Sequence, residues 1–154
     1  MKLSLTERLL HSTVRLTCTK SDGSVSCGTG FFYRILKDGD MMVPLIMTNK
    51  HVVKDAILGQ FCFTESSADA TPMHQNHLNF EADFASRWIN HPDPDVDLCC
   101  MNITPELELL SAQGMQPFIV YLDNKVLPDD TFVKDLLALE EVIMDCQPQI
   151  GQKL

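Results

Sequence analysis

The stretch VPLIMTNKHVV at residues 43–53 decides the predicted fold of this chain. An apolar run ends in two small polar residues, and Lys50 and His51 follow directly. Such a run predicts a buried strand that carries a histidine at its end. Residues 51–56 are too few for a free-standing helix, so a single turn is expected after the histidine.

Two further stretches, one before and one after this strand in the sequence, also have strand patterns. Residues 27–35 read CGTGFFYRI, a strand in which Gly28 and Gly30 are expected to form a hinge or a bulge. Residues 95–103 read DVDLCCMNI, in which acidic residues open another apolar strand. Both stretches, like the first, favour β-structure.

Strand-like segments recur along the chain with Gly, Pro and Asp turns between them. The predicted strands cover residues 14–18, 28–36, 41–48, 59–64 and 97–103. A polar loop is expected over 65–77. Residues 77–88 are ambiguous, although Leu78, Phe80 and Ala82 alternate as in a strand. This spacing favours an all-β barrel or sandwich over βαβ units. Pro44 lacks an N–H and predicts an edge or a bulge.

The two ends are less regular than the centre. A short helix is expected over residues 4–12, with Thr6 as its N-cap. Residues 104–154 are expected to form an irregular connection, with a candidate helix over 130–139 and a candidate strand over 140–144.

Composition excludes several classes of protein. The chain has 154 residues, which suits one domain, and 45% are hydrophobic, which is enough for a packed core. Its formal net charge of −9 argues against nucleic acid or an anionic membrane as partner. No signal peptide or membrane span is visible, so a cytoplasmic location is expected. The six cysteines show no disulfide framework.

Three motifs, taken in order, resemble one protein family. They are GTGFF at 28–32, TNKHVV at 48–53 and DLCCMNI at 97–103. Together they resemble the first half of a trypsin-like (chymotrypsin-fold) serine peptidase. The segment WINHPD at 88–93, and the lack of a cysteine directly after His51, resemble the bacterial disulfide-free type.

The resemblance implies roles for two residues that lie 46 positions apart. His51 would be the general base, and Asp97 would orient its imidazole and stabilise the positive charge. Asp95 is the competing carboxylate. Asp97 is preferred because the residues after it fit the family strand without a gap.

The resemblance also implies the architecture. A single six-stranded antiparallel barrel of the chymotrypsin type is expected over residues 13–103. The helix of residues 1–12 would precede it, and residues 104–154 would be a connecting segment, truncated before the second barrel.

The family's Gly-x-Ser-Gly nucleophile motif is absent from these 154 residues. The expectation is therefore a peptidase half that is inactive alone. Its partner would be a peptide or protein substrate, or a complementary second-barrel polypeptide. The alternative is a non-catalytic half-peptidase, acting as a binding module or surviving as a decayed gene product.

Other candidate chemistry is weaker. His74 and His77 form an H-x-x-H without an evident third ligand, so no metal or cofactor is predicted. Cys146 as a thiol nucleophile lacks the neighbouring glycines that build an oxyanion turn.

Overall fold

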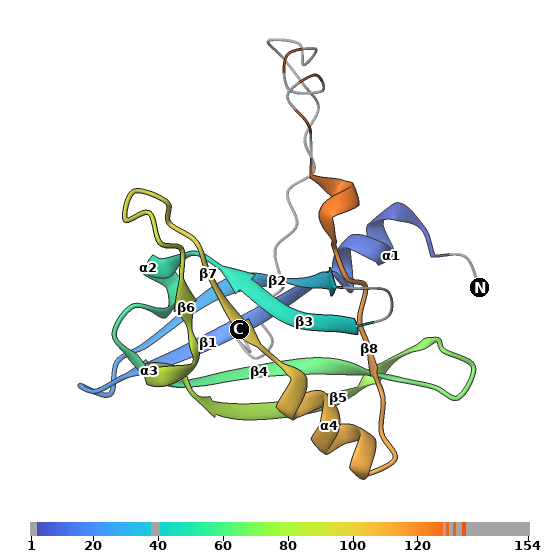
Figure 1. The fold of residues 1–154 in the computed structure, drawn as a ribbon. Helices are drawn as coiled ribbons and strands as arrows, with labels where there is room; N and C mark the ends of the chain where they lie inside the picture. The colour runs from blue at the N-terminus through green and yellow to red at the C-terminus, as the bar shows by residue number, and fades with distance from the viewer. Residues whose placement is uncertain (1–2, 38–40, 128, 130, 132–133, 135–154) are drawn as a thin grey trace.

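The structure, a computed structural model, describes residues 3–37, 41–127, 129, 131 and 134 (Figure 1). The strands are β1 (Thr13–Lys20), β2 (Val25–Lys37), β3 (Met41–Thr48), β4 (Ala56–Ser66), β5 (Pro72–Asp83), β6 (Ile89–Asn90), β7 (Cys99–Asn102) and β8 (Pro117–Phe118). The helices are α1 (Leu5–Leu10), α2 (Lys50–Val53), α3 (Phe84–Arg87) and α4 (Thr104–Ala112), followed by the 3-10 turn η1 (Asn124–Val126).

The strands form one antiparallel sheet. Its order is β5-β4-β1-β2-β3-β7-β6, and β8 pairs with β4. The expectation of a mainly antiparallel β fold is therefore confirmed. The sheet has eight strands and its hydrogen-bonded path is open, so closure into a six-stranded barrel stays a prediction.

The two end strands of the path are near neighbours in the chain. Helix α3 follows β5 directly, and only Trp88 separates α3 from β6. Asp83 begins this short helix, because its carboxylate accepts a hydrogen bond from the Ala85 N–H at 2.9 Å. Figure 1 shows α3 between the ends of β5 and β6. Since a short segment joins its two ends, the sheet curls back toward itself.

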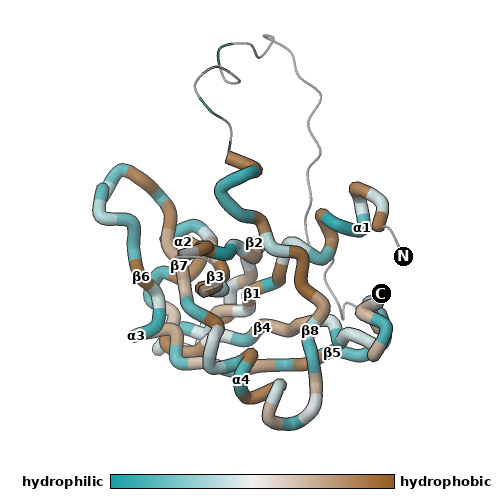
Figure 2. The backbone as a smooth tube through the Cα atoms, turned by 45° about the vertical axis from the view of Figure 1, so that its right-hand side comes forward, coloured by the Kyte–Doolittle hydropathy of each residue, from teal (hydrophilic) through white to brown (hydrophobic). Residues whose placement is uncertain are grey.

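Alternation places one face of each central strand inside. In β1, Val14, Leu16 and Cys18 are buried, whereas the residues between them are only partly covered. This is the period of two that a strand with one buried face requires. The hydrophobic colouring along β3 agrees with its place between β2 and β7 (Figure 2).

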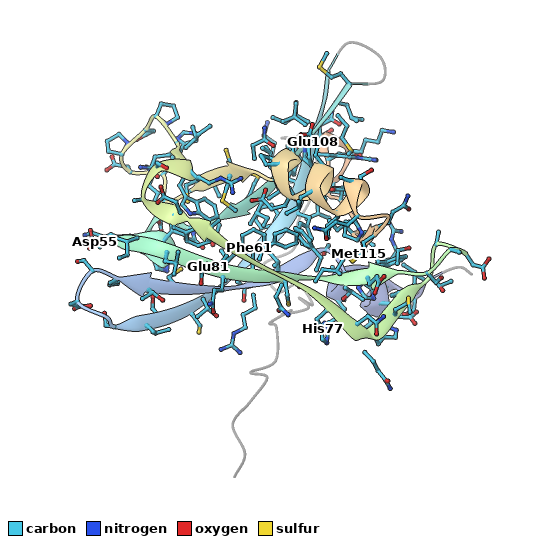
Figure 3. The ribbon with its side chains drawn as sticks, turned by 90° about the horizontal axis from the view of Figure 1, so that it is seen from below. Asp55, Phe61, His77, Glu81, Glu108 and Met115 are labelled. Atoms are coloured by element: carbon cyan, nitrogen blue, oxygen red, sulfur yellow. The ribbon has the colours of Figure 1, made fainter. Side chains whose placement is uncertain are left out.

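Aromatic rings fill the hollow side of the curled sheet (Figure 3). Phe61 and Phe63 of β4 lie with ring centroids 5.7 Å apart, and Phe80 of β5 lies 5.3 Å from Phe63. Phe84 of α3 is 2% exposed and packs over Gly59, where a Cβ atom would overlap its ring. Burying a phenylalanine contributes about 1.5–3 kcal/mol, so this cluster supplies much of the folding free energy.

Helix α1 lies within the expected residues 4–12, but its N-cap differs from the expected one. Ser4, not Thr6, is the N-cap: its hydroxyl accepts a hydrogen bond from the Glu7 N–H at 3.2 Å. The Glu7 carboxylate accepts in return from the Ser4 N–H at 2.8 Å. The Thr6 prediction was wrong because this reciprocal box starts two residues before it.

Two expectations of irregular structure were also wrong. Residues 104–112 form helix α4, and β5 begins at Pro72, inside the expected loop of residues 65–77. The candidate helix over 130–139, apart from Thr131 and Lys134, and the candidate strand over 140–144 lie outside the described residues. Across the described part, no helix is both long enough and apolar enough to span a membrane.

Candidate active site

Thr48 fixes the end of β3, where the predicted histidine follows. It is 2% exposed, and its hydroxyl donates to the Thr29 carbonyl of β2 at 3.0 Å. Its own carbonyl accepts from the Cys99 thiol of β7 at 3.5 Å. The strand end is therefore held from both sides, directly before α2 begins at Lys50.

Gly28 and Gly30 have a different role from the expected hinge or bulge. The β1–β2 ladder is regular at both, with Leu16 opposite Gly28 and Val14 opposite Gly30. A Cβ atom on Gly28 would overlap Val52 of α2, and one on Gly30 would lie 3.0 Å from the Met47 carbonyl. The glycines thus let α2 and β3 approach β2 closely.

Consecutive residues at the start of α2 hold the loop between β6 and β7. The Asn49 side-chain amide donates to the Asp97 carbonyl at 2.7 Å. Lys50 Nζ donates to the Asp93 carbonyl at 2.9 Å. The His51 N–H donates to Asp97 Oδ1 at 3.1 Å. The loop stands beside α2 in Figure 1, and these bonds fix how close it comes.

The two predicted site residues are in direct contact. His51 Nδ1 and Asp97 Oδ2 are hydrogen-bonded. An ionised carboxylate only accepts, so Nδ1 carries the proton of this hydrogen bond. The hydrogen bond from His51 is the main reason that the pKa of Asp97 lies below its usual value. The imidazole is 70% exposed and the carboxylate 47% exposed.

Asp95, the competing carboxylate, lies elsewhere in the same loop. Its backbone N–H donates to Asp93 Oδ1 at 2.9 Å, which shapes the turn after His91-Pro92. Asp97, two residues later, is the residue whose side chain reaches His51. The structure thus brings together the preferred pair of the sequence interpretation.

A cleft of about 590 Å³ opens beside the pair. Its lining includes Lys50, His51, Lys54, Trp88 and Asp97, and no Ser, Thr or Cys belongs to the lining in the described part of the chain. The Trp88 indole nitrogen is buried, and it has no hydrogen-bond partner among the described residues. The cleft thus offers apolar, cationic and proton-accepting groups together.

The chemistry available to this arrangement is proton transfer. A histidine whose Nδ1 is tied to a carboxylate can accept a proton at Nε2 from a hydroxyl or thiol and later release it. The lining described above supplies no such nucleophile. Cys146, the alternative nucleophile, lies outside the described residues.

Of the remaining histidines, two were singled out by the sequence pattern as possible metal ligands, and one buried histidine was missed. His74 and His77 of the H-x-x-H lie exposed on β5, and no cluster of three or more metal-ligating side chains is found where the structure is described. His11 was missed. It is 5% exposed and its Nε2 is buried, yet nothing in the surrounding LLHST segment marks it as unusual.

Comparison of the chain with family models, curated proteins and solved structures gives no match. The interpretation of the site therefore depends on its own geometry.

Proposed function

We propose that this chain is the histidine- and aspartate-bearing half of a trypsin-like serine peptidase. His51 would act as general base, Asp97 would orient it, and a second-barrel polypeptide would supply the serine and the oxyanion hole. The observation that carries the proposal is the His51–Asp97 contact. The Asp97 carboxylate is hydrogen-bonded to both the ring Nδ1 and the backbone N–H of the same histidine. This two-point attachment fixes the ring orientation that proton transfer needs.

The strand order supports the family's barrel as the architecture. The sequence β4-β1-β2-β3-β7 is hydrogen-bonded throughout, and β5 pairs with β4 at one end. Strand β6 already pairs with the outer edge of β7, so closing a ring would need one ladder between β5 and this β6–β7 end of the sheet. Helix α3 and β6 lie along the chain at that junction. One further ladder would therefore convert the open sheet into the proposed barrel.

The exposure of the pair fits a site completed by another polypeptide. An imidazole that is 70% exposed works poorly as a general base for peptide hydrolysis, because water screens the charges that develop. A second barrel over the cleft would exclude that water. Substrates would be peptides or proteins held between the two barrels.

Fluorophosphonate labelling tests the proposal, because the reagent reacts with an activated serine. The purified chain should not be labelled. Co-expression with the polypeptide encoded directly downstream should give a labelled serine on that polypeptide. The variant Asp97→Asn should lower the labelling rate by about 10³–10⁴-fold, since the wrong tautomer is then favoured. His51→Ala should abolish labelling, and Asp95→Asn is the matched control that should retain it.

Three outcomes would contradict this function. Labelling of the isolated chain would place the nucleophile within it. Labelling of the pair that survives His51→Ala would remove the general base. A downstream region without any Gly-x-Ser-Gly frame would remove the partner.

The second candidate is a non-catalytic module that binds peptides in the same cleft. The observation in its favour is the cleft of about 590 Å³, whose lining joins Trp88 to Lys50 and Lys54. It predicts saturable peptide binding that Asp97→Asn leaves intact, with no labelling in any combination.

A further inference from the structure

A second cavity, of about 210 Å³, lies far along the sheet from the peptidase-like cleft. Its apolar floor is formed by Val14, Phe32 and Phe63, which are 2%, 3% and 1% exposed. The exposed His74 and His77 of β5 stand at its rim, and Phe118 of β8 forms a side wall. His77, labelled in Figure 3, lies in the middle of β5, beside the irregularity in its ladder with β4.

His11, just after α1, lines this cavity and is held on several sides. Its N–H donates to the Glu7 carbonyl at 3.1 Å, and its carbonyl accepts from the Val120 N–H at 3.0 Å. Its ring stacks on His74 with centroids 5.5 Å apart and meets the edge of Phe118 at 4.9 Å. The ring is therefore fixed in place by backbone and aromatic contacts.

The Nε2 atom of this fixed ring has no partner. The atom is buried, the residue is 5% exposed, and no described residue hydrogen-bonds to it. A buried polar atom without a partner is unfavourable for folding, so its persistence beside a cavity indicates a group that enters from outside.

The charge of the lining selects the class of ligand. Three imidazoles line the cavity, and no carboxylate belongs to the described lining. Arg15 of β1 borders it, with its guanidinium donating to Cys27 Sγ at 3.1 Å. The Glu7 carboxylate is close by, but it accepts hydrogen bonds from Ser4. The polar lining therefore suits an anion, while the floor suits an apolar body.

The volume of the cavity limits the apolar part of the ligand. An apolar cavity of about 150 Å³ holds benzene, so 210 Å³ accommodates one ring with a short acidic arm. We propose that this cavity binds a small organic carboxylate of the phenylacetate class, with His11 Nε2 donating a hydrogen bond to the carboxylate.

Binding of such an anion should take up a proton. Burial, followed by the nearby His74, holds the pKa of His11 below its usual value, and Glu7 opposes this shift. The other titratable groups of the lining are His77 on β5, Arg15 on β1 and Cys62 on β4. A carboxylate at Nε2 favours the protonated imidazole, so the His11 pKa should rise when the site is filled.

Isothermal titration with sodium phenylacetate, run in two buffers of different ionisation enthalpy, tests the proposal. The chain should bind one equivalent with net proton uptake, and 2-phenylethanol, which lacks the charge, should bind at least about tenfold more weakly. His11→Leu should weaken phenylacetate binding about tenfold or more. His11→Gln, whose amide can reach the Nε2 position, should bind more tightly than the leucine variant.

Urea unfolding of each variant shows that it is folded. Should His11→Leu fail to fold, the comparison of phenylacetate with 2-phenylethanol and the His11 ring signals of the unmodified chain decide the matter. No saturable binding, equal binding of the neutral analogue, or unchanged affinity in a folded His11→Leu variant would overturn the assignment.

Discussion

Contact with His51 lowers the pKa of Asp97 below its usual value. The side-chain hydrogen bond from His51 is the largest cause of its lowered pKa, and the His51 N–H adds to it. A folded-state pKa below the unfolded value adds stability above the unfolded pKa, and this stability is lost as pH falls through the folded pKa.

The first prediction concerns the contact between His51 and Asp97. His51→Ala should raise the pKa of Asp97 toward its usual value, so the acid side of the stability curve should become flatter. Carbon-detected NMR titration of the Asp97 carboxyl group in both proteins measures the shift. An identical Asp97 pKa in the two proteins would show that the contact is absent in solution.

Gly59 gives a second prediction, because the Phe84 ring occupies the space where its side chain would stand. Gly59→Ala should destabilise the fold by about 1–3 kcal/mol through overpacking. Urea denaturation measures the loss. The double variant Gly59→Ala with Phe84→Leu should recover part of it, and additive losses would argue against the contact.

One side-chain contact could be predicted from the sequence, and one buried histidine could not. The order of GTGFF, TNKHVV and DLCCMNI was enough to select His51 and Asp97, because strand ends on one sheet edge bring distant residues together. No sequence pattern marks His11 as buried, because its burial depends on contacts with β5 and β8. Both strands begin more than 60 residues later in the sequence.

At the scale of elements, one ion pair joins α3 to α4. Arg87 Nη1 contacts Glu106 Oε1, and Arg87 Nη2 donates to the Asn102 carbonyl at 2.6 Å. The guanidinium is 25% exposed and the carboxylate 8% exposed. The hydrogen bond to Glu106 is the main cause of the raised pKa of Arg87.

The third prediction is an order of stabilities. Arg87→Ala leaves the buried Glu106 without its cation, whereas Glu106→Ala leaves Arg87 with water and the Asn102 carbonyl. Arg87→Ala should therefore cost more, roughly 1–3 kcal/mol, below the value for a fully buried pair because the guanidinium is partly solvated. Chemical denaturation of both variants measures the order, and the reverse order would contradict this account.

The same elements show where sequence patterns were informative. Strands β1 to β4 and β7 were predicted because they alternate or run apolar, as buried strands do. Helix α4 was missed because its buried side includes Glu106, a charge that pairs with Arg87. The start of β5 was missed because its first half is exposed at the end of the sheet, so its polar residues resemble a loop.

Over the whole molecule, thiol reactivity should follow burial. Burial raises the pKa of Cys18 and of Cys99 to about 11. Cys27 is exposed, and the hydrogen bond from Arg15 at 3.1 Å is the main cause of its lowered pKa.

The fourth prediction concerns iodoacetamide labelling, read peptide by peptide by mass spectrometry. Cys27 should be labelled in native buffer. Cys18 and Cys99 should be labelled only as denaturant unfolds the sheet, with the same midpoint as the loss of β circular dichroism. Native labelling of Cys18 at a rate near that of Cys27 would show that the core opens locally.

The place of β1 in the sheet has a consequence for synthesis of the chain. Strand β1 ends at Lys20, and its neighbour β2 follows closely in the sequence, beginning at Val25. Its other neighbour, β4, begins only at Ala56. At roughly 5–20 residues per second, a ribosome needs about two to seven seconds to make the intervening segment. Through that interval the nascent chain presents an unpaired backbone edge with alternating apolar side chains, the surface that chaperones cover and that misassembled aggregates recruit.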